Sequence, residues 1–329
     1  MHHASTRLGA LVFVVTAMLS TLAFAADHTI RAGHVYTADS VPHQALERFA
    51  ELVAERSDGA VAVELFPGGQ MGSDPELQEA VALGTLELIV TGASLIDRYA
   101  PAYTMIGAPY VIRDWEHLQA VLDGDIGSDM AAAMEAQGVV LAGYSKRGNR
   151  HLTSNEAIRS PDQLDGYKLR VPNNRGQLAV WTAIGANPTP MAWGEVYTSL
   201  QTGVIDAQEN PFAILASFSI AEVQDYVMLT GHLTNPYFYA MSAGALDGMD
   251  AETRDVVLTA LDDALAFGTE LQDQADEGYV DQLLAGGMTF VEDVDLDAFI
   301  AAAQVGHQDL LADASDEAQR VYQRIVEVP

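Results

Sequence analysis

The chain has 329 residues, a formal charge of −30 and no cysteine. This length suits two domains better than one small core. The lack of cysteine excludes disulfides, thiolate metal sites and cysteine nucleophiles. The negative charge disfavours nucleic acid as a partner, because phosphate backbones are repelled. Lysine contributes only Lys146 and Lys168 to the 16 basic residues, which fits an ordinary acidic protein or one adapted to high salt, where self-repulsion is screened.

The N-terminal stretch predicts an export signal. Arg7 is the only basic or acidic residue before Asp27 apart from histidine, an apolar run covers residues 8–19, and residues 23–25 read Ala-Phe-Ala, a small-residue cleavage pattern. We therefore expect residues 1–25 to be a signal peptide and the mature protein to be periplasmic. The alternative is a buried N-terminal helix. No cysteine follows the cleavage site and no later segment is apolar enough to span a bilayer, so we expect neither a lipid anchor nor a membrane span.

The first part of the mature sequence alternates between strand and helix patterns. Apolar alternation and turn residues predict strands at 29–34, 61–65 and 86–90. Between them, one helix follows Ser40 and stops at Gly59, and a second is opened by a capping-box pattern and closes at Gly84. The capping box consists of Ser73 and Glu76. Strands that alternate with helices predict a parallel sheet with helices on its faces.

The same alternation returns later in the chain. We expect a strand at 167–171, helices at 177–184 and 193–202, and a strand at 204–206 that runs into Gln208-Glu209-Asn210-Pro211. A helical pattern over 251–283 could exceed about 40 Å in length, enough to brace two lobes.

The expected fold class is α/β, with two lobes joined by several crossing strands. Lobe I is predicted to comprise residues 26–147 plus about 236–275. Lobe II is predicted to comprise residues 148–235 plus about 276–329. No repeat, low-complexity tract or flexible linker separates them.

The positive charges, rather than any catalytic motif, mark the candidate site. The chain has no G-x-S-x-G, H-E-x-x-H, P-loop or G-x-G-x-x-G pattern, and we expect no catalytic residue, metal or cofactor. A basic cluster in an acidic chain predicts an anion site, and the planar fork of arginine suits a carboxylate. The alternative is surface charge paired with nearby acids. The clustered residues between 146 and 175 are Lys146, Arg147, Arg150, Arg159, Lys168, Arg170 and Arg175.

Arg170 stands out within this cluster. It lies in the strand pattern 167–171, directly before Val171 and Pro172. Ligands of α/β sheets bind beyond the carboxyl ends of the strands. If this strand ends at a cleft between the lobes, the guanidinium of Arg170 points at the ligand.

Three ordered stretches carry a family resemblance: KLRVPN at 168–173, GANPTPM at 185–191 and WGEVYTSLQTGVIDAQENP at 193–211. Weaker similarities are Gly33-His34, the turn at 66–72 and Thr153-Ser154-Asn155. Together they resemble the signature region of the TRAP-transporter substrate-binding proteins of the C4-dicarboxylate type. Ala207 stands where the family usually has glycine, a departure that affects only the local turn.

The resemblance implies a two-lobed periplasmic binding protein, type II-like, with a long helix spanning both lobes. It implies a monomer without enzymatic activity that hands its ligand to the membrane subunits of a TRAP-type permease driven by an ion gradient.

The resemblance also assigns site residues. Arg170 corresponds to the arginine that pairs with the ligand carboxylate, Arg150 to a second ligand-facing arginine, and Asn210 to the asparagine that orients the carboxylate. Asn210 could instead be a simple turn residue before Pro211, and Trp193 could be a core residue rather than a platform for a sugar ring. The remaining pocket candidates, the last four of them weaker, are Asn173, Asn174, Gln70, Ser94, Tyr237 and Tyr239.

The expected ligand is a small organic acid with at least one carboxylate. Polar candidate residues favour a sugar acid, such as a uronate or an aldonate. A C4-dicarboxylate comes next, with Arg150 or Lys146 binding the second carboxylate. The alternatives are a ligand-binding partner of a sensor, a periplasmic enzyme without a recognisable catalytic motif, and a binding protein of an ATP-driven transporter, against which the signature from Arg170 to Asn210 argues.

Overall fold

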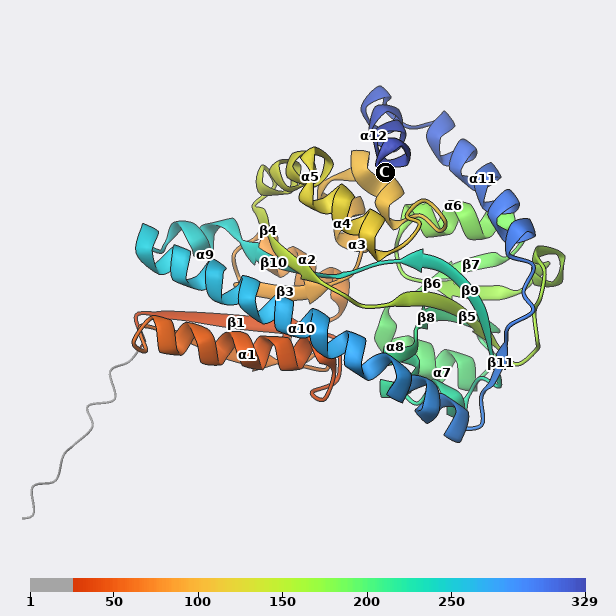
Figure 1. Ribbon diagram of the computed structural model, residues 1–329, viewed down its shortest axis with the longest axis horizontal. Helices are drawn as coiled ribbons and strands as arrows, with labels where there is room; N and C mark the ends of the chain where they lie inside the picture. The colour runs from red at the N-terminus through yellow and green to blue at the C-terminus, as the bar shows by residue number, and fades with distance from the viewer. Residues whose placement is uncertain (1–25) are drawn as a thin grey trace, which may run out of the picture.

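The computed structural model describes residues 26–329 (Figure 1). The predicted signal peptide, residues 1–25, lies outside the described residues. Two sheets form the framework. The first has the strand order β2-β1-β3-β10-β4, and the second β11-β9-β5-β8-β6-β7. The strands are β1 (His28–His34), β2 (Val61–Phe66), β3 (Leu88–Thr91), β4 (Val139–Ser145), β5 (Asn149–Ser154), β6 (Lys168–Val171), β7 (Asn187–Pro190), β8 (Ala207–Pro211), β9 (Tyr226–Thr234), β10 (Tyr237–Ser242) and β11 (Thr289–Val291).

Helices cover the faces of both sheets (Figure 1). In residues 26–329 no helix is long and apolar enough to cross a membrane. The α-helices are α1 (Val41–Arg56), α2 (Asp74–Ala82), α3 (Ser94–Tyr99), α4 (Trp115–Asp123), α5 (Asp125–Glu135), α6 (Arg175–Ile184), α7 (Val196–Gln201), α8 (Phe212–Ser217), α9 (Ala243–Asp247), α10 (Ala251–Ala285), α11 (Leu296–Ala312) and α12 (Asp316–Glu327). The short 3-10 helices are η1 (Pro101–Gly107), η2 (Pro161–Leu164), η3 (Trp193–Glu195) and η4 (Ile220–Glu222).

The first lobe follows the expected order of strands and helices. β1 pairs in parallel with β2 and β3, which confirms the predicted parallel arrangement. The predicted capping box is also present: the backbone N–H of Ser73 donates to Glu76 Oε2 at 2.7 Å, so α2 starts directly after Ser73. β10 joins the sheet from much later in the chain and pairs antiparallel with β3 and β4. The sheet is therefore mixed.

In the second lobe the predicted strand at 204–206 is wrong in its bounds. β8 begins only at Ala207, and the predicted helix at 193–202 divides into η3 and α7. The backbone N–H groups of Val204 and Ile205 both donate to Ser199 O, because they close the end of α7 through a turn at Gly203. These groups are not available for a strand ladder.

Three chain segments cross between the two sheets. β4 continues into β5 through residues 146–148, and β9 continues into β10 through Asn235 and Pro236 (Figure 1). The 35-residue helix α10 is the third, packing on α1 and β4 of the first lobe and on α8 of the second. At Gly268 a side chain would meet the Cβ of Ala45 at 3.0 Å, so α10 and α1 pack closely there. The predicted long helix spanning both lobes is confirmed.

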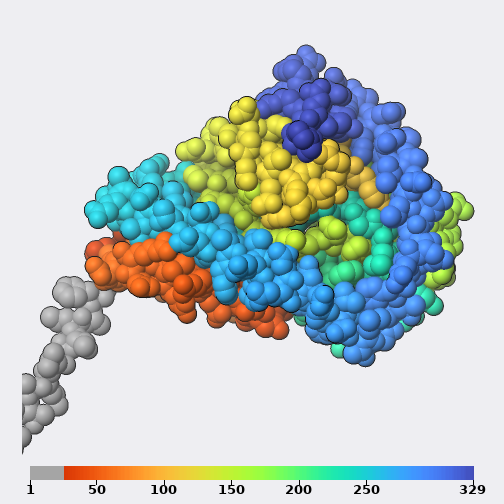
Figure 2. Space-filling view, in the orientation of Figure 1, coloured from red at the N-terminus to blue at the C-terminus, as the bar shows by residue number. Residues whose placement is uncertain are grey.

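The C-terminal helices form a further connection. α11 packs on α6 of the second lobe, whereas α12 packs on η1 and α5 of the first. Figure 2 shows this blue segment running along one edge of the molecule from the end of α10 to the yellow segment near residues 100–135. Hydrogen bonds hold α12 in place, since the His117 ring contacts Ile325 O at 3.0 Å and Arg113 donates to Val328 O at 2.9 Å. The last helix thus lies against the lobe opposite to the one that our predicted boundaries give it.

Candidate ligand-binding site

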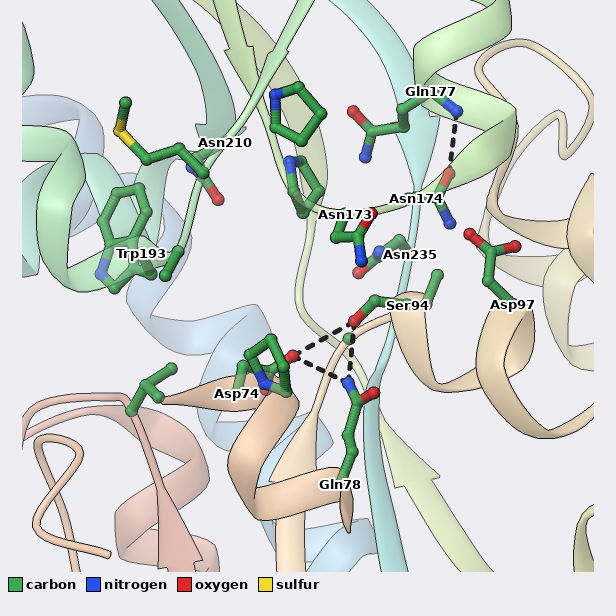
Figure 3. A pocket seen from close by; sticks show the side chains of 18 of the residues that line it. Asp74, Gln78, Ser94, Asp97, Asn173, Asn174, Gln177, Trp193, Asn210 and Asn235 are labelled. Atoms are coloured by element: carbon green, nitrogen blue, oxygen red, sulfur yellow. Dashed lines mark hydrogen bonds between the residues drawn. The ribbon is translucent and has the colours of Figure 1, made fainter. Parts of the chain in front are cut away.

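A cavity of about 720 Å³ lies between the two lobes (Figure 3). The wall from the first lobe comes from the end of β1, the start of α2, and α3. The wall from the second lobe comes from the ends of β6, β7 and β8 and the start of α6, so the carboxyl ends of neighbouring strands meet the cavity or its rim. Arg147 and Asn235, from the two strand crossings, also line it.

Arg170 reaches the cavity from β6 and is 4% exposed. Its Nε and Nη2 atoms donate to Met191 O at 3.1 and 2.7 Å, and its guanidinium lies 5.4 Å from the centre of the Trp193 ring. Burial, together with the nearby charges of Arg150 and Arg147, lowers the pKa of Arg170 to about 9, although Glu209 acts in the opposite direction. This depressed pKa reflects a guanidinium with too little negative charge around it, which an anionic ligand would supply.

Arg150, on β5, has a carboxylate partner within the protein. Its Nε and Nη2 atoms donate to the two carboxylate oxygens of Glu209 at 2.5 and 2.7 Å. His232 lies 2.9 Å from the same carboxylate. Burial would raise the pKa of Glu209, but Arg150 and His232 together lower it to about 2, so this carboxylate is ionised. The charge of Arg150 is therefore neutralised before any ligand binds.

Arg147 is buried at the crossing between β4 and β5. Its guanidinium lies between the rings of Tyr36 and Tyr237, at 5.5 and 5.0 Å from their centres. Its only hydrogen bond among residues 26–329 is a long one to Asn235 Oδ1 at 3.5 Å, and its Nε atom has no partner there. Like Arg170, it has no carboxylate within ion-pair distance in the described chain. Two buried guanidinium groups thus line the cavity without a carboxylate partner.

The opposite wall carries an acidic group in a network of donors. Asp74 Oδ1 accepts a hydrogen bond from Thr91 at 2.7 Å. Asp74 Oδ2 accepts from Gln78 at 2.9 Å and from Ser94 at 3.1 Å (Figure 3). Burial raises the pKa of Asp74 above its ordinary value, and the opposing effects of Thr91, Ser94 and the charges of Arg147 and Arg170 offset this only in part. Donors to both oxygens are the surroundings that an ionised carboxylate requires.

One end of the cavity is formed where α3 meets the N-terminus of α6. Asn174 caps α6, because its Oδ1 accepts from the backbone N–H of Gln177 at 2.8 Å. Asp97 Oδ2 accepts from the backbone N–H of Arg175 at 2.6 Å, and burial raises the pKa of Asp97 to about 6. Asn174 Nδ2 and Gln177 Oε1 are buried and have no partner among residues 26–329. Both side chains line the cavity and can pair with ligand hydroxyl groups.

Comparison with known proteins identifies the family. Residues 32–314 match the bacterial extracellular solute-binding proteins, family 7. The chain belongs to this family. It is similar to a solute-binding protein of Roseobacter denitrificans, with 37% identity over 96% of each chain. Two solved structures of TRAP periplasmic solute-binding proteins resemble it closely. One, from Roseobacter denitrificans with bound L-galactonate, is 36% identical, has a TM-score of 0.85 and is aligned over 91% of this chain and 99% of its own. The other, from Sulfitobacter sp. NAS-14.1 with bound β-D-galacturonate, is 29% identical, has a TM-score of 0.87 and the same two coverages.

The protein is therefore a periplasmic solute-binding protein of the TRAP type, a family of binding proteins rather than enzymes. The expected family, two-lobed α/β fold and periplasmic location are confirmed. Within residues 26–329, no group of three or more histidine, aspartate or glutamate side chains could hold a metal ion.

The structure of this solute-binding protein brings most predicted site residues to one cavity, and their roles in binding stay predictions. Asn210 donates one hydrogen of Nδ2 to Gln208 Oε1 at 2.7 Å, which leaves the other hydrogen for a ligand. Trp193 is half-buried: the guanidinium of Arg170 lies over its ring, and the ring also packs edge-on against Phe218 at the margin of the core. The predicted residues that line the cavity are Arg170, Arg150, Asn210, Asn173, Asn174, Trp193 and Ser94.

Three predicted residues do not line this cavity. Gln70 is exposed in the turn after β2. Tyr237 is buried behind Arg147 and supports its guanidinium. Tyr239 is buried, and Ser145 donates to its hydroxyl at 3.4 Å.

Sequence reasoning missed several lining residues. Arg147 was visible as part of the basic cluster, but its position at a lobe crossing was not. Asp74 was visible only as the first residue of a helix. Gln78, Asp97, Gln177 and Asn235 gave no signal, because they are polar residues in unremarkable helix and turn patterns.

Proposed function

We propose that this protein captures a sugar acid, either a uronate or an aldonate, in the cavity between its lobes and delivers it to the membrane subunits of a TRAP permease. One observation carries the proposal. Two buried guanidinium groups, Arg147 and Arg170, line the cavity without a carboxylate partner in the described chain. Burying an unpaired charge is costly, so the ligand is expected to supply the missing carboxylate.

The rest of the cavity suits a hydroxylated ligand. Its volume of about 720 Å³ falls inside the roughly 300–1,000 Å³ that is usual for small-molecule sites. Asp74, Asn174 and Gln177 present oxygens and amide hydrogens to it, which match the hydroxyl groups of a sugar acid. The relatives with bound L-galactonate and β-D-galacturonate support this ligand class.

A thermal-shift panel followed by calorimetry tests the proposal. Uronates and aldonates should raise the melting temperature, because a ligand that binds only the folded state stabilises it by mass action. Neutral sugars of the same size should give no shift, since they lack the carboxylate for Arg147 and Arg170. A shift with C4-dicarboxylates alone would replace the sugar acid by the second candidate ligand, whose two carboxylates could each pair with one of the two guanidinium groups.

The delivery step has its own test. Deleting the gene in its natural host should abolish uptake of the identified sugar acid while leaving uptake of an unrelated nutrient unchanged. Normal uptake in the deletion strain, with loss of a transcriptional response to the acid, would favour the sensor partner.

A further inference from the structure

The buried charges around the cavity leave one positive charge in excess. Three guanidinium groups, Arg147, Arg150 and Arg170, are 7%, 2% and 4% exposed. Two carboxylates accompany them. Glu209 pairs with Arg150, and Asp74 lines the same cavity, where both of its oxygens accept hydrogen bonds as those of an ionised carboxylate do. A ligand with a single carboxylate therefore brings the buried charge to zero, whereas a ligand with two carboxylates leaves an excess negative charge.

The other charged groups of the cavity rim do not change this count. Arg98 forms an ion pair with Glu79 at 3.1 Å. Asp97 is largely buried, and burial raises its pKa to about 6. The exposed Arg175, whose backbone N–H group donates to Asp97 Oδ2, carries the opposite charge and acts on this carboxylate, so the two side chains together add no net charge. Each of these two sets of charges is neutral as a whole, so neither interacts strongly with a charged ligand in the cavity.

The position of Asp74 determines how a singly charged ligand is oriented in the cavity. Asn210 lies on the wall of the second lobe, and Asp74, Gln78 and Ser94 lie on the wall of the first (Figure 3). Arg170, on β6, belongs to the wall of the second lobe. A ligand carboxylate bound to Arg170 places the remainder of the ligand against Asp74. Asp74 can accept a hydrogen bond from a hydroxyl group there, but it repels a second carboxylate.

We propose that Asp74 is a specificity-determining residue, which makes this site bind singly charged sugar acids and reject the dicarboxylic acids with the same carbon chain. This inference rests on the proposed function. The inference goes beyond the proposed function, because it states which end of a sugar acid the first lobe recognises and which residue excludes a diacid.

L-galactonate and galactarate form a matched pair of ligands for the test. Both are open chains of six carbons, and they differ at one end, where a hydroxymethyl group in the first is a carboxylate in the second. Calorimetry on the full mature protein should give at least tenfold tighter binding of galactonate. D-gluconate and glucarate form a second pair with the same difference, which guards against an effect of one particular stereochemistry.

Asp74→Asn removes the negative charge and keeps the shape of the side chain. We expect this variant to lose at least tenfold of the preference for galactonate, because the cavity then carries two unbalanced positive charges. Asp58→Asn is the control: Asp58 is exposed in the turn before β2, outside the cavity, and the substitution changes the net charge by the same amount. It should leave the preference unchanged. Asp74→Ser, a smaller uncharged variant, replaces Asp74→Asn if circular dichroism shows that the latter is unfolded.

The outcomes separate the two levels of the proposal. If the wild-type protein binds no sugar acid, the proposed function is wrong. If it binds galactonate and galactarate equally, or if a folded uncharged variant of Asp74 keeps the wild-type preference, the sugar-acid function stands and the role of Asp74 is overturned.

Discussion

Arg170 is the side chain on which ligand affinity should depend most. Two of its nitrogens are held by Met191 O, and Nη1 makes no hydrogen bond within residues 26–329. We expect Arg170→Ala to weaken binding of the cognate acid by roughly 2–5 kcal/mol, at least tenfold, because the ligand carboxylate would lose a charged partner in a buried site. Arg170→Lys should also weaken binding clearly, since lysine lacks the planar fork. Calorimetry measures both effects.

Two further variants calibrate this result. Asn210→Ala should cost less than Arg170→Ala, because it removes only a hydrogen bond. Arg159→Ala is the matched control, since Arg159 belongs to the same basic cluster in the sequence but is exposed and pairs with Asp293. If a folded Arg170→Ala protein binds the acid with an affinity within a factor of about three of wild type, the role of Arg170 is wrong. The basic cluster would then be surface charge paired with nearby acids.

The sequence could not predict which of Arg147 and Arg150 has a carboxylate partner within the protein. Both lie in the same basic cluster, and the resemblance favoured Arg150. Glu209 neutralises Arg150 only because β5 and β8 pair with Arg150 opposite Pro211, a register between distant segments. No local pattern specifies that register. The surroundings of Asp74 were equally hidden, because Thr91 and Ser94 meet it through the packing of α2 beside β3.

At the scale of elements, the contact between α3 and α6 should make stability depend on pH. Burial raises the pKa of Asp97 from 3.8 to about 6. Because the folded pKa exceeds the unfolded one, the stability that protonation provides is fully present below about pH 4 and is lost as the pH rises through 6. Asp97→Asn mimics the neutral carboxyl group. Its melting temperature relative to wild type should therefore increase between pH 4 and pH 7.

Thermal melts of both proteins at matched ionic strength across this range provide the measurement. Asp309→Asn, at an exposed aspartate on α11 outside the contact between α3 and α6, serves as the reference. A constant difference between Asp97→Asn and wild type over the whole range would show that Asp97 titrates at its ordinary pKa.

The packing of α10 on α1 predicts opposite effects at two glycines of the same helix. Gly268 lies against Ala45, so Gly268→Val should push the two helices apart and lower the melting temperature. A Cβ atom added at Gly278 would meet no other atom within 4 Å, so Gly278→Ala should stabilise the helix by about 0.5–1 kcal/mol. Denaturant unfolding compares the two, and equal effects of both substitutions would contradict the close contact.

The sequence predicted the existence of the helices and parallel strands well, but it predicted their first and last residues less well. Helices α1, α2 and α10 are specified by local periodicity and caps, which need no knowledge of the rest of the chain. The start of β8 at Ala207 depends instead on how Val204 and Ile205 close α7. β10 received no prediction, because its place between β3 and β4 is a long-range pairing.

At the scale of the whole molecule, the two walls of the cavity predict closure on ligand. A sugar acid that contacts Arg170 on one lobe and Asp74 on the other stabilises the conformation in which both walls reach it. Small-angle scattering should show a smaller radius of gyration with the cognate acid than without it. A neutral sugar at the same concentration should have no effect. An unchanged radius at saturating acid would mean that the lobes are already closed in the free protein.

The position of β10 in the first sheet has a consequence for secretion. β10 separates β3 from β4, so this sheet has a gap until residues 237–242 join it. Roughly two hundred residues must therefore emerge on the far side of the membrane after β1 before the first lobe can complete its hydrophobic core. Such long-range pairing slows folding, because the entropy cost of closing a long loop arises before the stabilising contacts form. The same requirement applies before export: a chain that cannot complete this domain early stays unfolded, and an unfolded chain is the state that a narrow export channel accepts.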